Sequence, residues 1–492
     1  MTENLSLIYF GVYTLFLFFI AWITSRKATN STYFVGNRKS PWYLVAYGMI
    51  GTSLSGVTFI SVPGWVGSSG FSYMMVVFGY IFGYLTIIGV LLPLYYRMKL
   101  TSIYTYLEKR FGFWTYKTGA FFFLLSRFIG AAFRMFIVVE VLQLFVFGQY
   151  DLPFVAVVTL FILLILLYSI KGGIRTIVFT DTLQTTFMLL AVFLSIYYIK
   201  QGLGLEWSGL ANVVSSSSYS DMIVSDWGHN QHFLKQFFSG MFIAIVMTGL
   251  DQDMMQKNLS CKSLKDAQKN MFALSMVLVV VNFIFLVLGV LLYYYAEQSG
   301  IQIPSKTDHI FPLIALESLG PIAAAVFVIG LVSAAYSSAD SAITALTTSF
   351  CIDMLDMEKW KRSDLYKQRS RMLVHLGIST FLIALMVLFK EINNEAVISS
   401  IFTVAGYTYG PLLGFFAFGL FCNYKINDKI IPYIAILAPI LSYIIKWYSS
   451  NYLQYNFGFE LLILNGAITY LFMFVFRNKS RKIYHLENHE EF

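Results

Sequence analysis

The feature that most constrains this chain is a series of apolar segments that repeats from one end to the other. A helix needs about 20 mostly apolar residues to cross the hydrocarbon core of a bilayer. Thirteen segments meet this requirement, and they predict an all-α integral membrane protein with thirteen transmembrane helices. They cover residues 5–25, 42–66, 71–97, 115–147, 153–170, 177–199, 236–255, 270–296, 320–350, 372–390, 395–422, 429–447 and 458–476.

Composition argues against a soluble protein, and the absence of catalytic motifs argues against an enzyme. Hydrophobic residues make up 58% of the chain and charged residues 12%, whereas a soluble domain carries about 25% charged residues. The sequence contains no metal-ligand spacing, nucleotide-binding loop or nucleophile elbow. The first apolar run lacks a basic leader and a small-residue cleavage site, so we expect a membrane span rather than a cleaved signal peptide.

The Lys and Arg residues predict the orientation. Such residues are enriched in cytoplasmic loops, and most of the 34 in this chain fall in alternate loops. Examples are Arg26 and Lys27 after the first segment, and Lys257 and Lys262 after the seventh. The pattern predicts a multi-pass protein of the plasma (inner) membrane with its N-terminus outside and its C-terminus in the cytoplasm. The net charge of +8 then reflects topology rather than a nucleic-acid partner.

Two of the segments are poor continuous helices. One contains Gly51-Thr-Ser-Leu-Ser-Gly56, and the other contains Met247-Thr-Gly-Leu-Asp251. Small residues at mid-membrane can let helices pack closely, or they can break a helix so that backbone carbonyls become free to bind a cation. The breaks fall in the second and seventh segments, five apart. This spacing is expected of an inverted five-helix repeat, and it favours ion binding.

The ninth segment carries acidic and hydroxyl groups together. Ser337, Asp340 and Ser341 lie at i, i+3 and i+4, and hence on one helix face. A carboxylate in hydrocarbon is costly and needs a cation or a partner. Asp181 is a second acid near a membrane end, where it either caps a helix or belongs to the same ion site.

Three stretches resemble the solute:sodium symporter family, and the resemblance covers nearly the whole chain. They are Tyr168–Gln184, Gly249–Leu259 and Tyr409–Phe421. The resemblance implies a LeuT-like core of two inverted five-helix repeats, with one extra helix before it and two after it. The implied parts are residues 1–40 (extra helix and loop), 41–200 (first repeat), 201–235 (extracellular loop), 236–423 (second repeat), 424–478 (two C-terminal helices) and 479–492 (tail).

The resemblance also implies where sodium binds, as one or two ions. The main sodium site matches the backbone of Gly51 and Leu54 with Ala334, Ser337 and Ser338. A second ion site matches Asp181, Ser337, Asp340 and Ser341. Asp340 departs from the family pattern, in which Ser or Thr is usual. Two acids near one site can hold a second sodium ion, or one of them can stay protonated, so proton coupling is an alternative for the second ion.

For the solute, the broken second segment offers the hydroxyls of Ser53, Ser55 and Thr58. Arg134 lies in the fourth segment, and its guanidinium is suited to binding a carboxylate. Ser55, Thr58 and Arg134 are similar to the sialic-acid-transporting branch of the family, in which an arginine holds the substrate carboxylate. The alternative is structural pairing of Arg134 with Glu140 or another acid.

A structural role is expected for Arg127, which lies nearer the cytoplasmic end. Sugar or inositol transport is a less favoured alternative. Sugar-carrying members place hydrogen-bonding residues where this chain has Ala244 and Met247, and these side chains cannot bind hydroxyls.

The predicted function is therefore sodium-coupled secondary active import of a small organic solute, sialic-acid-like or a monocarboxylate, by alternating access. We expect the chain to work as a monomer in the bilayer. A channel is less well supported because no filter-like motif is evident. A sensor with a transporter fold remains an alternative. Saturable uptake with turnover would separate a transporter from a sensor.

Overall fold

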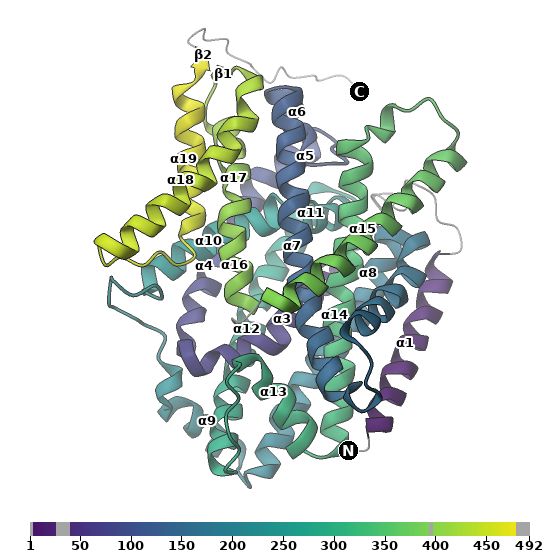
Figure 1. The fold of residues 1–492 in the computed structure, drawn as a ribbon, viewed down its shortest axis with the longest axis vertical. Coiled ribbons are helices and arrows are strands. Elements are labelled where there is room, and N and C mark those ends of the chain that lie inside the picture. Colours follow the sequence, from purple (N-terminus) through teal and green to yellow (C-terminus); the bar gives the residue numbers. More distant parts are fainter. Residues whose placement is uncertain (1–2, 26–39, 393–396, 479–492) are drawn as a thin grey trace.

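The computed structural model describes residues 3–25, 40–392 and 397–478, and helices dominate these ranges (Figure 1). Arg26, Lys27 and the tail 479–492, on which parts of the orientation and domain predictions rest, lie outside the described residues. The first half forms α1 (Glu3–Ser25), α3 (Trp42–Ser69), α4 (Tyr73–Thr86), α5 (Leu92–Arg97), α6 (Thr105–Arg110), α7 (Phe113–Phe145) and α8 (Phe154–Gly202).

The second half forms α9 (Trp207–Ser216), α10 (Phe233–Ala244), α11 (Gln252–Leu259), α12 (Leu264–Gln298), α13 (Ile310–Leu313), α14 (Pro321–Ser349), α15 (Asp364–Ile392), α16 (Val397–Thr408), α17 (Gly410–Phe421), α18 (Ile431–Tyr452) and α19 (Leu461–Val475). Short π-helical turns span Ile87–Leu91, Ile245–Gly249, Ile314–Ser318 and Phe350–Met354. Strand β1 (Lys425–Ile426) pairs antiparallel with β2 (Arg477–Asn478), with Lys425 opposite Asn478.

Length and composition mark eight of the described helices as able to cross a membrane, or ten if each bent pair is one span. This is a coarser result than thirteen, for two reasons. Residues Trp42–Arg97 count once where two segments were predicted, and Phe154–Ser169 and Leu461–Val475 are shorter than a usual span. The chain is thus a multi-pass helical protein, and the number thirteen stays a prediction.

Both predicted helix breaks are present. Within α3, Ser55 has φ 46° and ψ 175°, which interrupts the helix between Gly51 and Gly56. Beyond α10, Asp251 is extended, and the chain turns by 62° into α11. A third bend of 48° separates α16 from α17 and was not predicted. Pro411 opens α17 there, and a proline ring disfavours continuation of the preceding helix.

The broken helix α3 lies among α7, α8, α12 and α14 in the interior of the bundle (Figure 1). Helix α14 packs along α8, so the polar face of α14 meets α3 and α8. Helices α4 and α10 approach backbone to backbone, since a Cβ atom added at Gly79 or Gly240 would overlap a carbonyl oxygen of the other helix. Small residues permit such contacts between membrane helices. These contacts enclose a space beside the break in α3.

Candidate functional site

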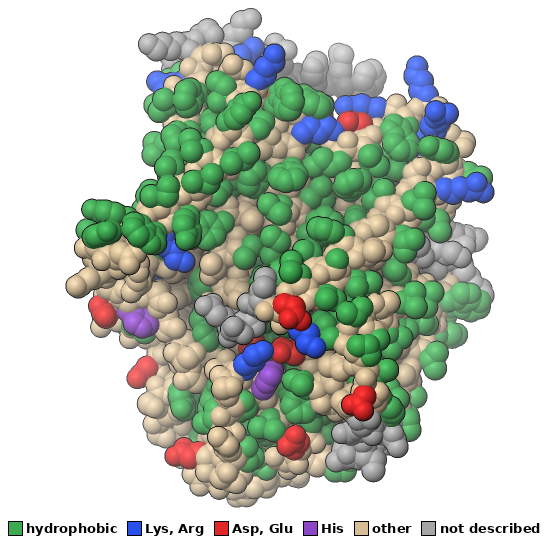
Figure 2. Space-filling view, in the orientation of Figure 1, with side chains coloured by type: hydrophobic (Ala, Val, Ile, Leu, Met, Phe, Trp, Pro, Cys, Tyr) green, Lys and Arg blue, Asp and Glu red, His purple; other side chains and the backbone are tan. Residues whose placement is uncertain are grey.

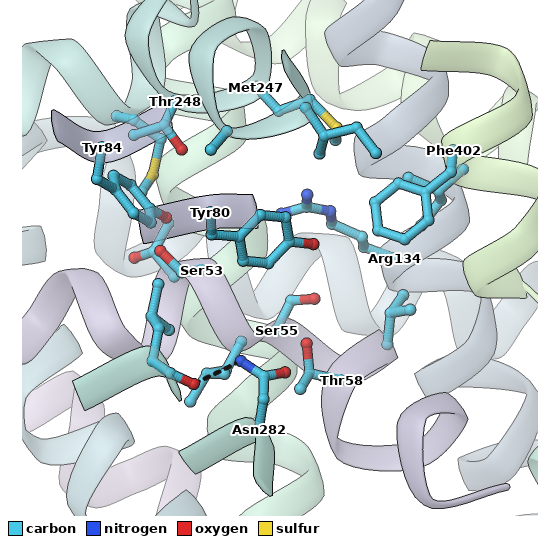
Figure 3. Close-up of a pocket in the computed structure, with 18 of the residues that line it drawn as sticks. Ser53, Ser55, Thr58, Tyr80, Tyr84, Arg134, Met247, Thr248, Asn282 and Phe402 are labelled. Atoms are coloured by element: carbon cyan, nitrogen blue, oxygen red, sulfur yellow. Dashed lines mark hydrogen bonds between the residues drawn. The ribbon is translucent and has the colours of Figure 1, made fainter. Parts of the chain in front are cut away.

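A cavity lies beside the break in α3 (Figure 3). Ser53, Ser55 and Thr58 line it from α3, and Arg134 lines it from α7, so the structure brings all four predicted solute-binding residues together. Ser53 Oγ is buried without a hydrogen-bond partner among the described residues. The other lining residues are Thr52, Leu54, Val57, Tyr73, Tyr80, Tyr84, Arg127, Ile243, Ala244, Met247, Thr248, Met254, Leu278, Asn282, Ile401 and Phe402.

The Arg134 guanidinium is the charged group at the centre of the cavity. It reaches between Tyr80 and Phe402 (Figure 3), and the residue is half-buried. Within the described ranges, no side chain forms a hydrogen bond or ion pair with it. Glu140, its suggested structural partner, instead accepts a hydrogen bond from Lys306 Nζ at 3.0 Å. Arg134 therefore presents an uncompensated positive charge to the cavity.

Several polar lining residues were not predicted. Tyr73 and Tyr80 of α4 place their hydroxyl oxygens 3.1 Å apart. Asn282 of α12 donates to the Leu278 carbonyl at 2.8 Å and lies beside Ser55 and Thr58 in Figure 3. A single asparagine in the apolar run Val279-Val-Val-Asn282 was a readable signal, because a polar amide in hydrocarbon is usually functional. Ala244 and Met247 line the same cavity and offer it no hydrogen bond.

A second group of polar residues surrounds the start of the break. The Gly51 N–H donates to Thr185 Oγ1 at 3.1 Å. A Cβ atom at Gly51 would overlap that hydroxyl and lie 3.1 Å from Ser337 Oγ, so only glycine lets α3 approach α8 and α14 this closely. Ser338 Oγ donates within its own helix to the Ala335 carbonyl at 3.1 Å. Leu54 and Ala334 are buried. Gly51 and Ser337 are thus adjacent, as a shared ion site requires.

Asp181 joins this group from α8 and is fully buried. Its Oδ1 accepts from Ser337 Oγ at 2.8 Å, and its Oδ2 accepts from Thr52 Oγ1 at 3.2 Å and from Lys257 Nζ at 2.6 Å. The alternative of a helix cap is wrong, because Asp181 lies in the interior of α8. The assignment of Lys257 to a cytoplasmic loop is also wrong. Its side chain is 1% exposed and lies in α11.

The other two residues predicted for the second ion site have different partners. Ser341 donates to Asp253 of α11. Asp340 Oδ2 accepts from Tyr168 of α8 at 2.9 Å, and Asp340 Oδ1 has no hydrogen-bond partner in the described part of the chain. Of the four predicted ligands, the structure joins Asp181 and Ser337 by a hydrogen bond.

Arg127 belongs to a buried ion network on the α11 side of the cavity. It forms an ion pair with Asp253, and its Nη1 lies 3.7 Å from Asp251 Oδ2. The Tyr409 hydroxyl of the bend between α16 and α17 donates to Asp251 at 2.6 Å. This pairing agrees with the structural role expected for Arg127. The network links α7, α11, α14 and α17 at the edge of the cavity, which Arg127 also lines.

The chain is similar to known sodium symporters over most of its length. The sodium:solute symporter family matches residues 33–429. The sodium/sialic acid symporter SiaT of Proteus mirabilis is 22% identical over 482 residues, which cover 94% of this chain and 93% of the relative. The sodium/sialic acid symporter NanT of Aliivibrio fischeri is 23% identical over 462 residues, covering 90% and 88%.

The fold also matches a solved structure of a Na⁺-coupled sialic acid symporter in a substrate-bound outward-open state. The TM-score is 0.82 at 20% sequence identity, and the match covers 96% of this chain and 97% of the other. This similarity shows a shared fold. Together with the family match over residues 33–429, it shows that the chain belongs to the sodium:solute symporter family and is a sodium-coupled membrane transporter rather than an enzyme.

Proposed function

We propose that this symporter imports a small carboxylate-bearing solute and that Arg134 binds the carboxylate. The observation that carries the proposal is the half-buried guanidinium in the cavity, which has no hydrogen-bond or ion-pair partner among the described residues. A buried cation without a partner is costly, so its retention is most simply explained by an anionic ligand. Both named relatives transport sialic acid according to their names, and that solute bears a carboxylate.

The rest of the solute faces hydroxyl and amide groups. Ser55, Thr58 and Asn282 lie together on one side of Arg134, and Tyr80 lies on another (Figure 3). This set favours a solute with several hydrogen-bonding groups, such as an acidic sugar, over a plain short-chain acid. A neutral sugar or inositol is the second candidate and has less support, because Ala244 and Met247 offer no hydrogen bonds. Sodium-dependent thermal stabilisation by sialic acids, monocarboxylates, sugars and inositols separates these classes.

The proposed main sodium site consists of the Gly51 and Leu54 backbone, the Ala334 carbonyl, and the Ser337 and Ser338 hydroxyls. The close approach of Gly51 to Ser337 supports it. Outside sodium ties α3 to α14, favours the outward-open state and prepares the cavity for solute. A negative interior then favours inward release, since moving one charge through the membrane is worth about 2.3 kcal/mol per 100 mV. The second site, at Asp181, Ser337, Asp340 and Ser341, has less support because Lys257 already pairs with Asp181.

We expect Ser337→Ala and Ser338→Ala each to lower sodium affinity about tenfold or more, because a hydrogen bond or contact to a charged group is worth about 1.5–3 kcal/mol. The measurement is the sodium concentration that half-saturates thermal stabilisation of the purified protein. Ser195→Ala is the matched control, since this buried hydroxyl donates within α8 to the Ala191 carbonyl. Unchanged sodium affinity in both Ser337 and Ser338 variants would exclude the proposed site.

We propose that the chain lies in the plasma membrane with its N-terminus outside and its C-terminus in the cytoplasm. Residues 41–200 and 236–423 form the two inverted repeats. In support, α1 begins at the end of the bundle opposite β2, and many of the visible Lys and Arg side chains gather at the β2 end (Figure 2). We also propose that one chain suffices for transport.

Cysteine labelling tests this orientation. In intact cells, a membrane-impermeant thiol reagent should label Ser216→Cys at the end of α9. It should label Ser363→Cys, just before α15, only after permeabilisation. Both positions are exposed, whereas the three native cysteines are buried. Labelling with the opposite pattern would invert the proposed topology.

A further inference from the structure

Lys257 places a positive charge inside the region proposed to bind ions. It lies in α11, directly after the second helix break, and its side chain is 1% exposed. Its Nζ donates to Asp181 Oδ2 at 2.6 Å and also to Thr52 Oγ1. A lysine ammonium in such a place is costly unless it is paired and hydrogen-bonded. Here it has both a carboxylate and a hydroxyl.

The ammonium has oxygen partners on two helices, and a third helix holds the same carboxylate. Asp181 comes from α8, Thr52 from the broken α3, and Ser337 of α14 binds the other oxygen of the same carboxylate at 2.8 Å. Thr52 Oγ1 also lies 3.4 Å from Ser337 Oγ. Hard cations prefer oxygen ligands of this kind, both anionic carboxylates and neutral hydroxyls. The ammonium therefore carries the charge, and has the oxygen ligands, of a bound monovalent cation.

We propose that Lys257 is a tethered cation that replaces a second sodium ion at Asp181, so that the transporter binds one sodium ion, at the main site. A sodium ion on Asp181 would meet the ammonium at close range in a low-dielectric interior, where like charges repel strongly. The other nearby acid, Asp340, accepts a hydrogen bond from the Tyr168 hydroxyl. This inference rests on the proposed ion-binding role of the region around Asp181 and Ser337. It sets the number of sodium ions bound per chain at one.

The proposal predicts that removing the tethered charge creates a sodium site. Purified full-length protein should bind one radioactive sodium ion per chain, and Lys257→Met should bind two, with the Hill coefficient for sodium rising from about 1 toward about 2. Lys257→Arg should keep one, because the charge remains. Lys257→Met combined with Asp181→Asn should also return to one, because the carboxylate that would hold the second ion is gone.

Stability provides a second readout. Lys257→Met leaves Asp181 buried without its cation, so its melting temperature should fall without sodium and recover steeply as sodium is added. The double variant should gain no more stability from sodium than the parent protein does through the main site. Lys262→Met is the matched control, because Lys262 is exposed after the same helix, and its melting curve and sodium binding should equal those of the parent.

Three results would overturn the proposal: two sodium ions bound to the parent protein, equal numbers of sodium ions bound to the parent and to a folded Lys257→Met variant, or a sodium rescue in the double variant as large as that in Lys257→Met. Failure of the proposed main site looks different. In that case the parent protein binds no sodium ion, whereas Lys257→Met binds one that disappears with Asp181→Asn. If neither protein binds sodium, the tethered-cation proposal is wrong as well.

Discussion

Replacing Arg134 with glutamine is expected to abolish useful uptake of the carboxylate solute while leaving the protein folded. The guanidinium lines the cavity without a partner in the described ranges, so the substitution mainly removes the charge pair with the solute. Truncating one member of a buried, hydrogen-bonded charge pair costs about 2–5 kcal/mol, which corresponds to about 30-fold to more than 1,000-fold in affinity. The measurement is solute-dependent thermal stabilisation together with uptake into proteoliposomes.

Two variants sharpen this experiment. Arg134→Lys keeps the charge but loses the planar pair of donors, and we expect an intermediate affinity. Arg134→Gln should retain sodium-induced stabilisation, because no proposed sodium ligand changes. It should also melt no lower than the parent protein without solute. If carboxylate and carboxamide forms of the same solute bind the parent protein equally well, Arg134 does not recognise a carboxylate.

Replacing Arg127 with methionine should have the opposite outcome, a severe loss of stability in the absence of any solute. Arg127 pairs with Asp253 and lies near Asp251, and all three are buried. Breaking a buried pair by removing one partner costs about 3–5 kcal/mol, because the remaining charge is left uncompensated. The check is the melting temperature of the purified protein, with Arg134→Gln as the matched arginine on the same helix.

A double variant tests whether the ion pair itself is responsible. Asp253→Asn added to Arg127→Met removes the uncompensated carboxylate, and it should recover part of the lost stability. The recovery is partial because Asp251 still lacks its nearby guanidinium and Ser341 loses a carboxylate acceptor. A stable Arg127→Met protein would show that the network contributes little to holding α7 against α11.

Local chemistry in the sequence was sufficient to predict the broken helices. Gly51, Gly56 and Gly249, with their polar neighbours, interrupt apolar segments where no soluble loop is expected, and both breaks occur where these residues are. Arg134 was also predictable, since an arginine inside a membrane span needs a function or a partner. The structure adds that no residue in its described part pairs with Arg134.

Lys257 was misplaced for a physical reason. The prediction of orientation assumes that a lysine near the end of a span faces water. The chain instead bends by 62° into α11, and Lys257 lies in the protein interior. Only the proximity of Asp181, 76 residues earlier in the chain, reveals the pairing. The partners of Asp340 and Ser341 were also unpredictable, because they lie on helices distant in the sequence. Adjacent residues on a helix point about 100° apart, so these two face different neighbours, Tyr168 and Asp253.

The polar residues of α4 and α12 were missed because a cavity is formed by helices that are distant in sequence. Tyr80 and Asn282 reach the solute region only when α4 and α12 pack around α3. Spacing within one segment shows which residues share a face, but it does not show which helix that face meets.

The central claim, sodium-coupled uptake, is tested most directly by proteoliposomes loaded without sodium and given the labelled solute that best stabilises the purified protein. With sodium outside, solute should accumulate transiently above its external concentration, and an inside-negative potential should increase the accumulation. With equal sodium on both sides and no potential, solute should only equilibrate. Concentrative uptake that persists when choline replaces sodium, or that ignores the imposed sodium gradient, would contradict the account.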